Sequence, residues 1–147
     1  LRPKSTGEVM LNSNDAFDSP KIDPKFFSER EDMDVMIKGY RKMMEIMDSE
    51  PLRPFTRKVQ DPVDINSDAD IEEAMRARAD TVYHPVGTCK MGSDDMSVVN
   101  HELKVHALEN VRVVDASIMP TLVGGNTNAP TIMIGEKAAD MIKSSLA

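Results

Sequence analysis

Three polar segments of the chain could carry chemistry, and each lies at the end of an apolar run. They are residues 83–88 (YHPVGT), residues 113–120 (VVDASIMP) and residues 124–131 (GGNTNAPT). His84 precedes a proline, which favours an extended backbone, and Gly87 allows another backbone or a planar ligand to approach closely. A histidine in such a place can act as a general base near neutral pH. The alternative is a hydrogen-bonded structural histidine, which composition alone favours.

The glycine-containing segment 124–131 has the features of a helix start that can receive an anion. Two glycines permit tight backbone geometry, and the asparagines and Pro130 mark a first helical turn. Free amide groups at such an end favour negative charge by roughly 0.3–1 kcal/mol. The alternative is an ordinary capped loop that holds no ligand. Asp115 has the default interpretation of a turn or cap residue after an apolar run.

The composition excludes several classes of protein. The chain has 147 residues, a formal net charge of -7 and a pI near 4.9. Binding to nucleic acid without sequence preference is therefore not expected, because phosphates require clustered Lys and Arg. The single cysteine, Cys89, cannot form an internal disulfide, and no apolar run approaches the roughly 18 residues of a membrane span. We expect a cytoplasmic or peripherally membrane-associated protein.

The periodicity of apolar residues predicts three helices, the first of them long. Ser28 and Glu31 have the spacing of a capping box, and the best helical pattern follows them. Its apolar residues are interpreted as core rather than as a ligand groove; they are Met33, Met36, Ile37, Tyr40, Met43, Met44 and Met47. A second helix is expected from Ser67 or Asp68 to Arg78, and a third over residues 130–144.

Short runs of β-forming residues predict several strands between the helices. A strand is expected within residues 6–13, followed by a loop over residues 14–24, and further short strands are expected at residues 56–60, 81–83, 86–89, 103–105 and 111–114. The predicted fold class is therefore α+β, with short, mainly antiparallel strands, one long helix and two shorter helices.

Four ordered blocks of the sequence resemble the C-terminal region of the glucose-methanol-choline (GMC) oxidoreductases, a family that includes choline and alcohol dehydrogenases. The blocks are residues 2–7 with 22–24, residues 84–92, residues 113–120 and residues 125–137. The resemblance covers nearly the whole chain. It departs from the family pattern at Ala107, where relatives often have glycine, and this puts the geometry of that turn in doubt.

The resemblance implies oxidation of a primary alcohol, either choline or an aliphatic alcohol, to an aldehyde by hydride transfer to N5 of FAD. It places His84 as the catalytic base and Asn126 as a hydrogen-bond partner of the alcohol oxygen. It also implies FAD contacts, from Tyr83 and His84 to the flavin ring, from Asp115 and Ala116 to the ribityl and pyrophosphate groups, and from Asn126, Thr127 and Asn128 to the N1 and C2=O edge.

The resemblance further implies an incomplete cofactor pocket. Residues 1–110 would form the C-terminal part of the substrate-binding domain, and residues 111–147 a strand, loop and helix of the FAD-binding domain. No Gly-x-Gly-x-x-Gly motif follows a strand, so the ADP half of FAD would bind the missing N-terminal part of the same protein. We therefore expect a fragment that begins at Leu1 within a longer chain, binds FAD weakly or not at all and does not turn over.

Two other classes of protein remain open from the residues alone. The first is a non-catalytic structural or interaction module in which His84 and Asn126 are structural. The second is a metal-binding domain, although no recognised zinc spacing joins its candidate ligands; they would be His84, Cys89, His101 and His106. For the fragment that the resemblance implies, strands from the missing part would normally complete the sheet, so exposed apolar edges could make the isolated fragment form a homo-oligomer or aggregate.

Overall fold

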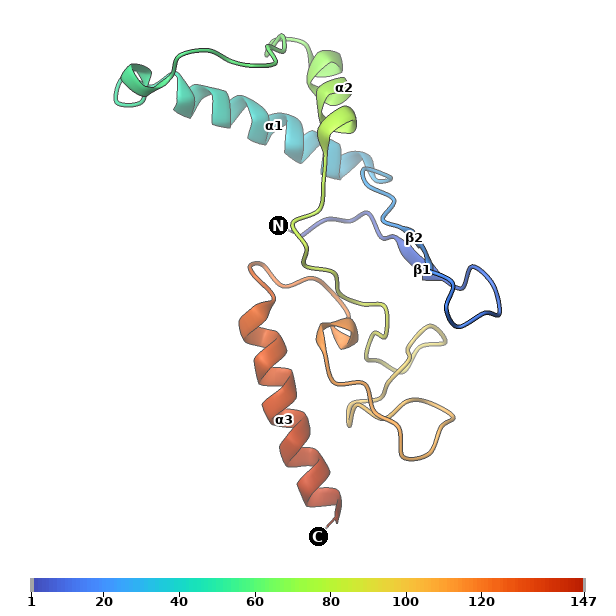
Figure 1. Ribbon diagram of the computed structural model, residues 1–147. Coiled ribbons are helices and arrows are strands. Elements are labelled where there is room, and N and C mark those ends of the chain that lie inside the picture. The colour runs from blue at the N-terminus through green and yellow to red at the C-terminus, as the bar shows by residue number, and fades with distance from the viewer. Residues whose placement is uncertain (1, 147) are drawn as a thin grey trace. The chain divides into compact units, whose positions relative to one another are not determined.

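The computed structural model describes residues 2–146, which form two compact units (Figure 1). One unit comprises residues 4–80, and the other comprises residues 81–146 together with Arg2 and Pro3. The described residues contain three α-helices and a two-stranded antiparallel sheet, and two of three isolated bridges are antiparallel. The predicted α+β class is confirmed. No helix in residues 2–146 is long and apolar enough to cross a membrane.

The first unit begins with a small β-hairpin. Strands β1 (Glu8–Met10) and β2 (Lys21–Asp23) pair antiparallel, with Val9 opposite Ile22. A Cβ atom at Gly7 would lie 2.2 Å from the Asp23 carbonyl oxygen, so this position requires glycine. The strand expected within residues 6–13 is confirmed. The prediction of a loop over residues 14–24 is wrong at its end, where β2 forms. Three residues are too few to show the alternating pattern by which a strand is predicted.

Two helices of the first unit pack on each other through residues at helical spacing. Helix α1 (Arg30–Met47) and helix α2 (Asp68–Arg78) enclose a core of Met33, Ile37 and Ile71, which are 0%, 3% and 0% exposed. The Ser67 hydroxyl accepts a hydrogen bond of 3.2 Å from the Asp70 amide, which confirms Ser67 as the cap of α2.

The apolar residues of α1 divide between two faces. Met33 and Ile37 are buried as expected, but Met36, Met43 and Met47 are 42%, 47% and 41% exposed. Their interpretation as core is therefore wrong within this chain. The periodicity of these residues predicted which of them lie on the same face of the helix. It did not predict whether other residues of this chain pack against each face.

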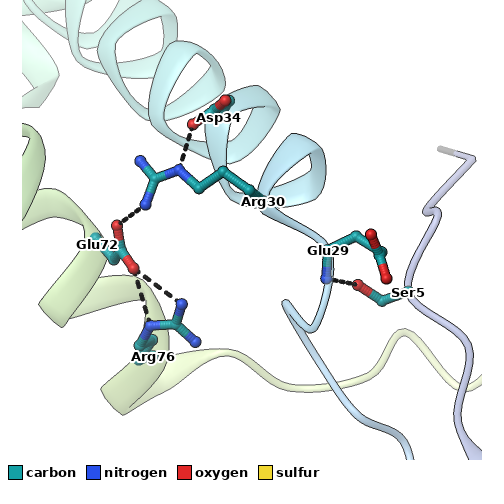
Figure 2. Close-up of polar contacts among 6 residues, drawn as sticks. All are labelled: Ser5, Glu29, Arg30, Asp34, Glu72 and Arg76. Atoms are coloured by element: carbon teal, nitrogen blue, oxygen red, sulfur yellow. Dashed lines mark hydrogen bonds and ion pairs between the residues drawn. The ribbon is translucent and has the colours of Figure 1, made fainter.

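The start of α1 is stabilised by a distant residue instead of the expected capping box. The cap residue is Glu29, which makes no side-chain cap hydrogen bond, so the prediction for Ser28 is wrong. The Ser5 hydroxyl accepts from the Glu29 amide at 3.2 Å (Figure 2). Asp32 in turn accepts from the amides of Lys4 and Ser5, both at 2.8 Å. The hydrogen bond from the Ser5 hydroxyl is the largest cause of a lowered Asp32 pKa.

An ion-pair cluster joins the two helices at their exposed edge (Figure 2). Glu72 on α2 pairs with Arg76 at 2.9 Å and with Arg30 on α1, and Arg30 also pairs with Asp34 at 2.8 Å. Hydrogen bonds from Arg76 and then from Arg30 lower the pKa of Glu72. The helix α1 is followed by the short 3-10 helix η1 (Arg53–Phe55), and the strand expected at residues 56–60 does not form.

The second unit consists of irregular segments packed against one long helix. Figure 1 shows helix α3 (Asn128–Leu146) beside the loops that precede it, which include the 3-10 helix η2 (Ala116–Ile118). With 19 residues, α3 is longer than expected. The core of this unit is made of six buried apolar residues, namely Val99, Leu103, Ile118, Met119, Ile134 and Ala138.

Most strands expected in the second unit are wrong. Residues 81–83 and 86–89 contain no strand, while residues 103–105 and 111–114 contribute only the bridges Val99 to Val105 and Lys104 to Arg112. The backbone in this unit hydrogen-bonds to turns and to η2 instead of forming a continuous ladder. β-forming composition therefore did not predict sheet pairing in this unit, and several of these residues, such as Val82 and Val111, are exposed.

Candidate active site

The segment that follows His84 is attached to η2 by backbone hydrogen bonds. The Cys89 amide donates to the Ser117 carbonyl at 3.0 Å, and the Met91 amide donates to the Ile118 carbonyl at 2.8 Å. Gly87 makes the preceding turn possible, since its φ of 89° lies in the left-handed region and an added Cβ would lie 3.4 Å from the Met119 carbonyl oxygen. The residues after His84 are thus fixed to the core of the unit.

The segment containing Asp115 provides the other side of these backbone contacts. The Asp115 carboxylate accepts a 2.7 Å hydrogen bond from the Ser117 amide and so caps η2. Its default interpretation as a cap residue is confirmed. Ala116 is half-buried and packs on the core. The contacts of Asp115 and Ala116 with a cofactor remain predictions.

The loop before α3 is fixed by a buried threonine. Thr127 is 8% exposed, and its carbonyl accepts from the Thr131 amide at 3.0 Å and from the Thr131 hydroxyl at 2.6 Å. Asn128 and Ala129 follow as the first helical residues, so their amides have no acceptor within the helix. The helix begins at Asn128, two residues before the expected start.

One side-chain contact joins the segment of His84 to the start of α3. The Thr127 hydroxyl and His84 Nδ1 are 3.1 Å apart, although 43 positions separate the two residues in sequence. The imidazole is half-buried. Among residues 2–146, the other ring nitrogen, Nε2, makes no hydrogen bond. The ring is therefore held by one nitrogen while the other is available.

The residue before His84 has a strained backbone. Tyr83 has φ of 60°, a left-handed conformation that costs a non-glycine residue roughly 1–2 kcal/mol. Its amide donates to the Thr81 hydroxyl at 3.0 Å, and its side chain is 75% exposed. Such strain is found preferentially at functional sites, where the surrounding structure maintains it.

The structure brings together most of the residues singled out from the sequence. His84 and Thr127 are in direct contact, and backbone hydrogen bonds connect the His84 segment to the segment of Asp115 and Ala116. Asn126 is adjacent to Thr127, but its side chain is exposed and makes no hydrogen bond to any residue in the range 2–146. The contact of Thr127 with the imidazole was not predicted, since spacing in sequence carries no information about it.

Two hollows, one in each unit, are lined by residues other than His84. One of about 350 Å³ is formed in the second unit by residues that do not include His84, namely Glu102, Arg112, Lys137, Asp140, Met141, Ser144 and Ser145. The candidate metal ligand His106 bonds to the Gly92 carbonyl through Nε2 at 3.1 Å. No group of three His, Cys, Asp or Glu residues within residues 2–146 could hold a metal ion. The described residues therefore give the metal-binding alternative no support.

Known proteins similar to this chain are oxidoreductases several times its length. A family profile described as GMC oxidoreductase matches residues 3–135. An alcohol dehydrogenase [acceptor] from Pseudomonas putida is 50% identical over 143 residues, which are 97% of this chain and 26% of that protein. An oxygen-dependent choline dehydrogenase from Klebsiella pneumoniae is 44% identical over 144 residues, again 97% and 26%.

A solved structure has the same fold over nearly the whole chain. It is a formate oxidase from Aspergillus oryzae RIB40 that carries a mutation studied for its effect on FAD modification. The TM-score is 0.90, and the identity is 33% over 95% of this chain and 25% of that one. The chain spans about a quarter of the length of each of these relatives.

Proposed function

The chain belongs to the GMC oxidoreductase family, and from this premise we propose that the protein of which it forms about a quarter oxidises a primary alcohol to an aldehyde with FAD. His84 is the base that accepts the hydroxyl proton. Asn126 donates a hydrogen bond to the alcohol oxygen and holds it in place. A positioned base contributes roughly 10²- to 10⁴-fold to such a reaction.

The observation that carries this proposal is the state of the His84 ring. Its Nδ1 atom is held by Thr127 at 3.1 Å, while Nε2 makes no hydrogen bond within residues 2–146. A general base needs a fixed ring and a free nitrogen directed to its substrate. Asn126 is the neighbour of Thr127 in sequence, and its side chain is exposed. Both proposed catalytic residues are therefore placed by Thr127, which is joined to Asn126 by the backbone and to His84 by a hydrogen bond.

The residues near His84 fit an isoalloxazine ring and its anionic edge. The Tyr83 side chain is 75% exposed beside His84, and the amides of Asn128 and Ala129 have no acceptor within α3. Such amides and the helix dipole stabilise negative charge. FAD, when bound, would supply the hydride acceptor at N5. We propose that residues 1–110 belong to the substrate domain and 111–147 to the FAD domain, with the ADP half held by the remaining chain.

An aliphatic alcohol is the preferred substrate over choline. Identity to the alcohol dehydrogenase is 50%, compared with 44% to 47% for choline dehydrogenases. Recognition of a quaternary ammonium uses aromatic side chains, and this chain contains no Trp, two Tyr and four Phe. Any cage for choline would therefore depend on the remaining part of the protein.

The test is anaerobic bleaching of the flavin absorbance in the full-length protein. A medium-chain primary alcohol and choline are compared side by side, with His84→Ala as the test variant and His101→Ala as the matched control. We expect bleaching by the aliphatic alcohol, a loss of roughly 10²- to 10⁴-fold in His84→Ala with FAD retained, and the wild-type rate in His101→Ala. Bleaching by choline alone would assign choline as the substrate, and rapid bleaching of His84→Ala would reject the catalytic role.

A further inference from the structure

We propose that Thr127 is a positioning residue that selects the reactive form of His84: its hydroxyl accepts a hydrogen bond from Nδ1–H and leaves Nε2 as the basic nitrogen. The contact that supports this role joins Thr127 Oγ1 and His84 Nδ1 at 3.1 Å. The inference rests on the proposed function, because it concerns how His84 is prepared to act as a base.

The Thr127 hydroxyl stands on a rigid support. The residue is 8% exposed, and both the amide and the hydroxyl of Thr131 donate to its carbonyl, at 3.0 and 2.6 Å. These bonds fix the backbone of Thr127 to the first turn of α3. A hydroxyl held in this way restricts the imidazole to one orientation, whereas a mobile side chain would not.

The sequence of the first turn leaves this hydroxyl free for the imidazole. A threonine directly before a helix usually accepts from the amide two or three residues further on. Here the third residue is Pro130, which has no amide hydrogen, and the Ala129 amide, two residues on, makes no hydrogen bond to Thr127 Oγ1. The only hydrogen bond made by Thr127 Oγ1 within residues 2–146 is the one to His84. Thr127 therefore occupies a cap position without using its side chain as a cap.

The direction of the hydrogen bond follows from the requirement for a base. A neutral imidazole carries one hydrogen, on either Nδ1 or Nε2, and a threonine hydroxyl can donate or accept. If the hydroxyl donated to Nδ1, the hydrogen of the ring would lie on Nε2, and that atom could not accept a proton. If it accepts from Nδ1–H, the Nε2 lone pair is free, and the same bond persists after Nε2 is protonated. Only the second arrangement gives a base.

The first experiment compares Thr127→Val with Thr127→Ser in the full-length, FAD-loaded protein. Valine keeps the shape but removes the acceptor, so the rate of flavin reduction at saturating alcohol should fall roughly ten-fold, as expected for one lost hydrogen bond, with little change in KM. Serine should restore most of the rate. Thr121→Val is the control, because it removes an exposed threonine hydroxyl from the same unit that hydrogen-bonds to neither His84 nor Thr127. An equal loss in Thr121→Val and Thr127→Val would reject the specific role of Thr127.

The second experiment reads the ring directly. Nitrogen-15 NMR of the full-length protein with labelled histidine distinguishes protonated from bare ring nitrogens, and a His84→Gln variant assigns the signals. We expect hydrogen on Nδ1 and a bare Nε2 in the wild type and in Thr127→Ser, and a mixture of both forms in Thr127→Val. Hydrogen on Nε2 in the wild type, or an unchanged Thr127→Val signal, would overturn the proposal.

The two proposals fail in different ways. If His84→Gln abolishes flavin reduction while Thr127→Val leaves both the rate and the ring signals unchanged, His84 remains the base and the role of Thr127 is rejected. If His84→Gln reduces flavin at the wild-type rate, the catalytic role of His84 is rejected, whatever the NMR signals of the ring.

Discussion

The two compact units of this chain are built in opposite ways. In residues 4–80 a small core lies between two regular helices, and exposed ion pairs around Glu72 join their edges. In residues 81–146 one long helix supports irregular loops, which are joined to one another by backbone hydrogen bonds and a larger apolar core. His84 and the other candidate site residues all lie in the second unit.

The two units differ in how strongly the position of one residue depends on a few particular contacts. Regular helices tolerate small displacements, because many equivalent contacts hold them together. A loop that positions one imidazole depends on a few particular contacts, such as the left-handed Gly87 and the hydroxyl of Thr127. We therefore expect substitutions in the first unit to affect stability alone, and matched substitutions in the second unit to affect stability and the flavin reaction together.

The largest effects should come from truncating a buried isoleucine in each core. Ile71 is 0% exposed in the first unit, and Ile118 is 5% exposed in the second. Replacing either with alanine should cost about 2–5 kcal/mol of unfolding free energy, measured by urea denaturation of the full-length protein. Only Ile118→Ala should also slow flavin reduction, because the cavity would let the backbone of η2 shift, and the Ile118 carbonyl accepts from the Met91 amide in the segment after His84. Equal rates of flavin reduction in Ile71→Ala and Ile118→Ala would contradict the expected difference between the two units.

A smaller effect, with opposite signs in the two units, is expected for glycine to alanine substitutions. Gly87 has φ of 89°, so Gly87→Ala should destabilise the protein by about 1–2 kcal/mol and slow flavin reduction. Gly39 lies within α1 and an added Cβ would meet nothing within 4 Å, so Gly39→Ala should stabilise it by about 0.5–1 kcal/mol. Thermal unfolding of both variants measures the signs. The same sign in both would show that backbone conformation does not distinguish the two positions.

The smallest effect should be the pH dependence of stability that Glu72 contributes in the first unit. Arg76 and Arg30 lower the pKa of Glu72 below its usual value of 4.5, so the unfolded chain binds this proton more readily than the folded one. Stability from Glu72 is therefore complete above about pH 4.5 and is lost as the pH falls through the lower, folded pKa. Glu72→Gln should flatten the acid limb of the stability curve, whereas Glu73→Gln should leave the Glu72 contribution in place. An unchanged acid limb in Glu72→Gln would contradict the assignment.

The same division explains what could be predicted from the sequence. Local patterns were reliable where one helix determines them: the spacing of Met33 and Ile37 predicted α1, and Ser67, one of the two start residues offered for α2, is its cap. The interactions at the start of α1 were not predictable, because the amide of its cap residue, Glu29, donates to the Ser5 hydroxyl, 24 positions away in sequence. The patterns of residues 84–88 and 124–131 singled out the two segments that meet in the structure, but not the hydrogen bond between Thr127 and His84 that joins them.

The strand predictions failed for a related reason. β-branched residues such as Val113 pack, partly buried, against the core, yet a ladder requires a partner strand of matching length and register. The loops of the second unit provide single bridges only. Similarly, the exposed Met36, Met43 and Met47 show that a helix face can be apolar without being covered by this chain.

One feature of the chain path bears on the order in which the protein is made. Arg2 lies with the second unit, where its guanidinium approaches Gly124, although residues 4–80 intervene. During synthesis, the first unit can complete its contacts as soon as its own residues leave the ribosome. The imidazole of His84, by contrast, acquires its threonine only when the last helix begins to emerge. Translation therefore completes the first unit well before His84 and Thr127 can come into contact.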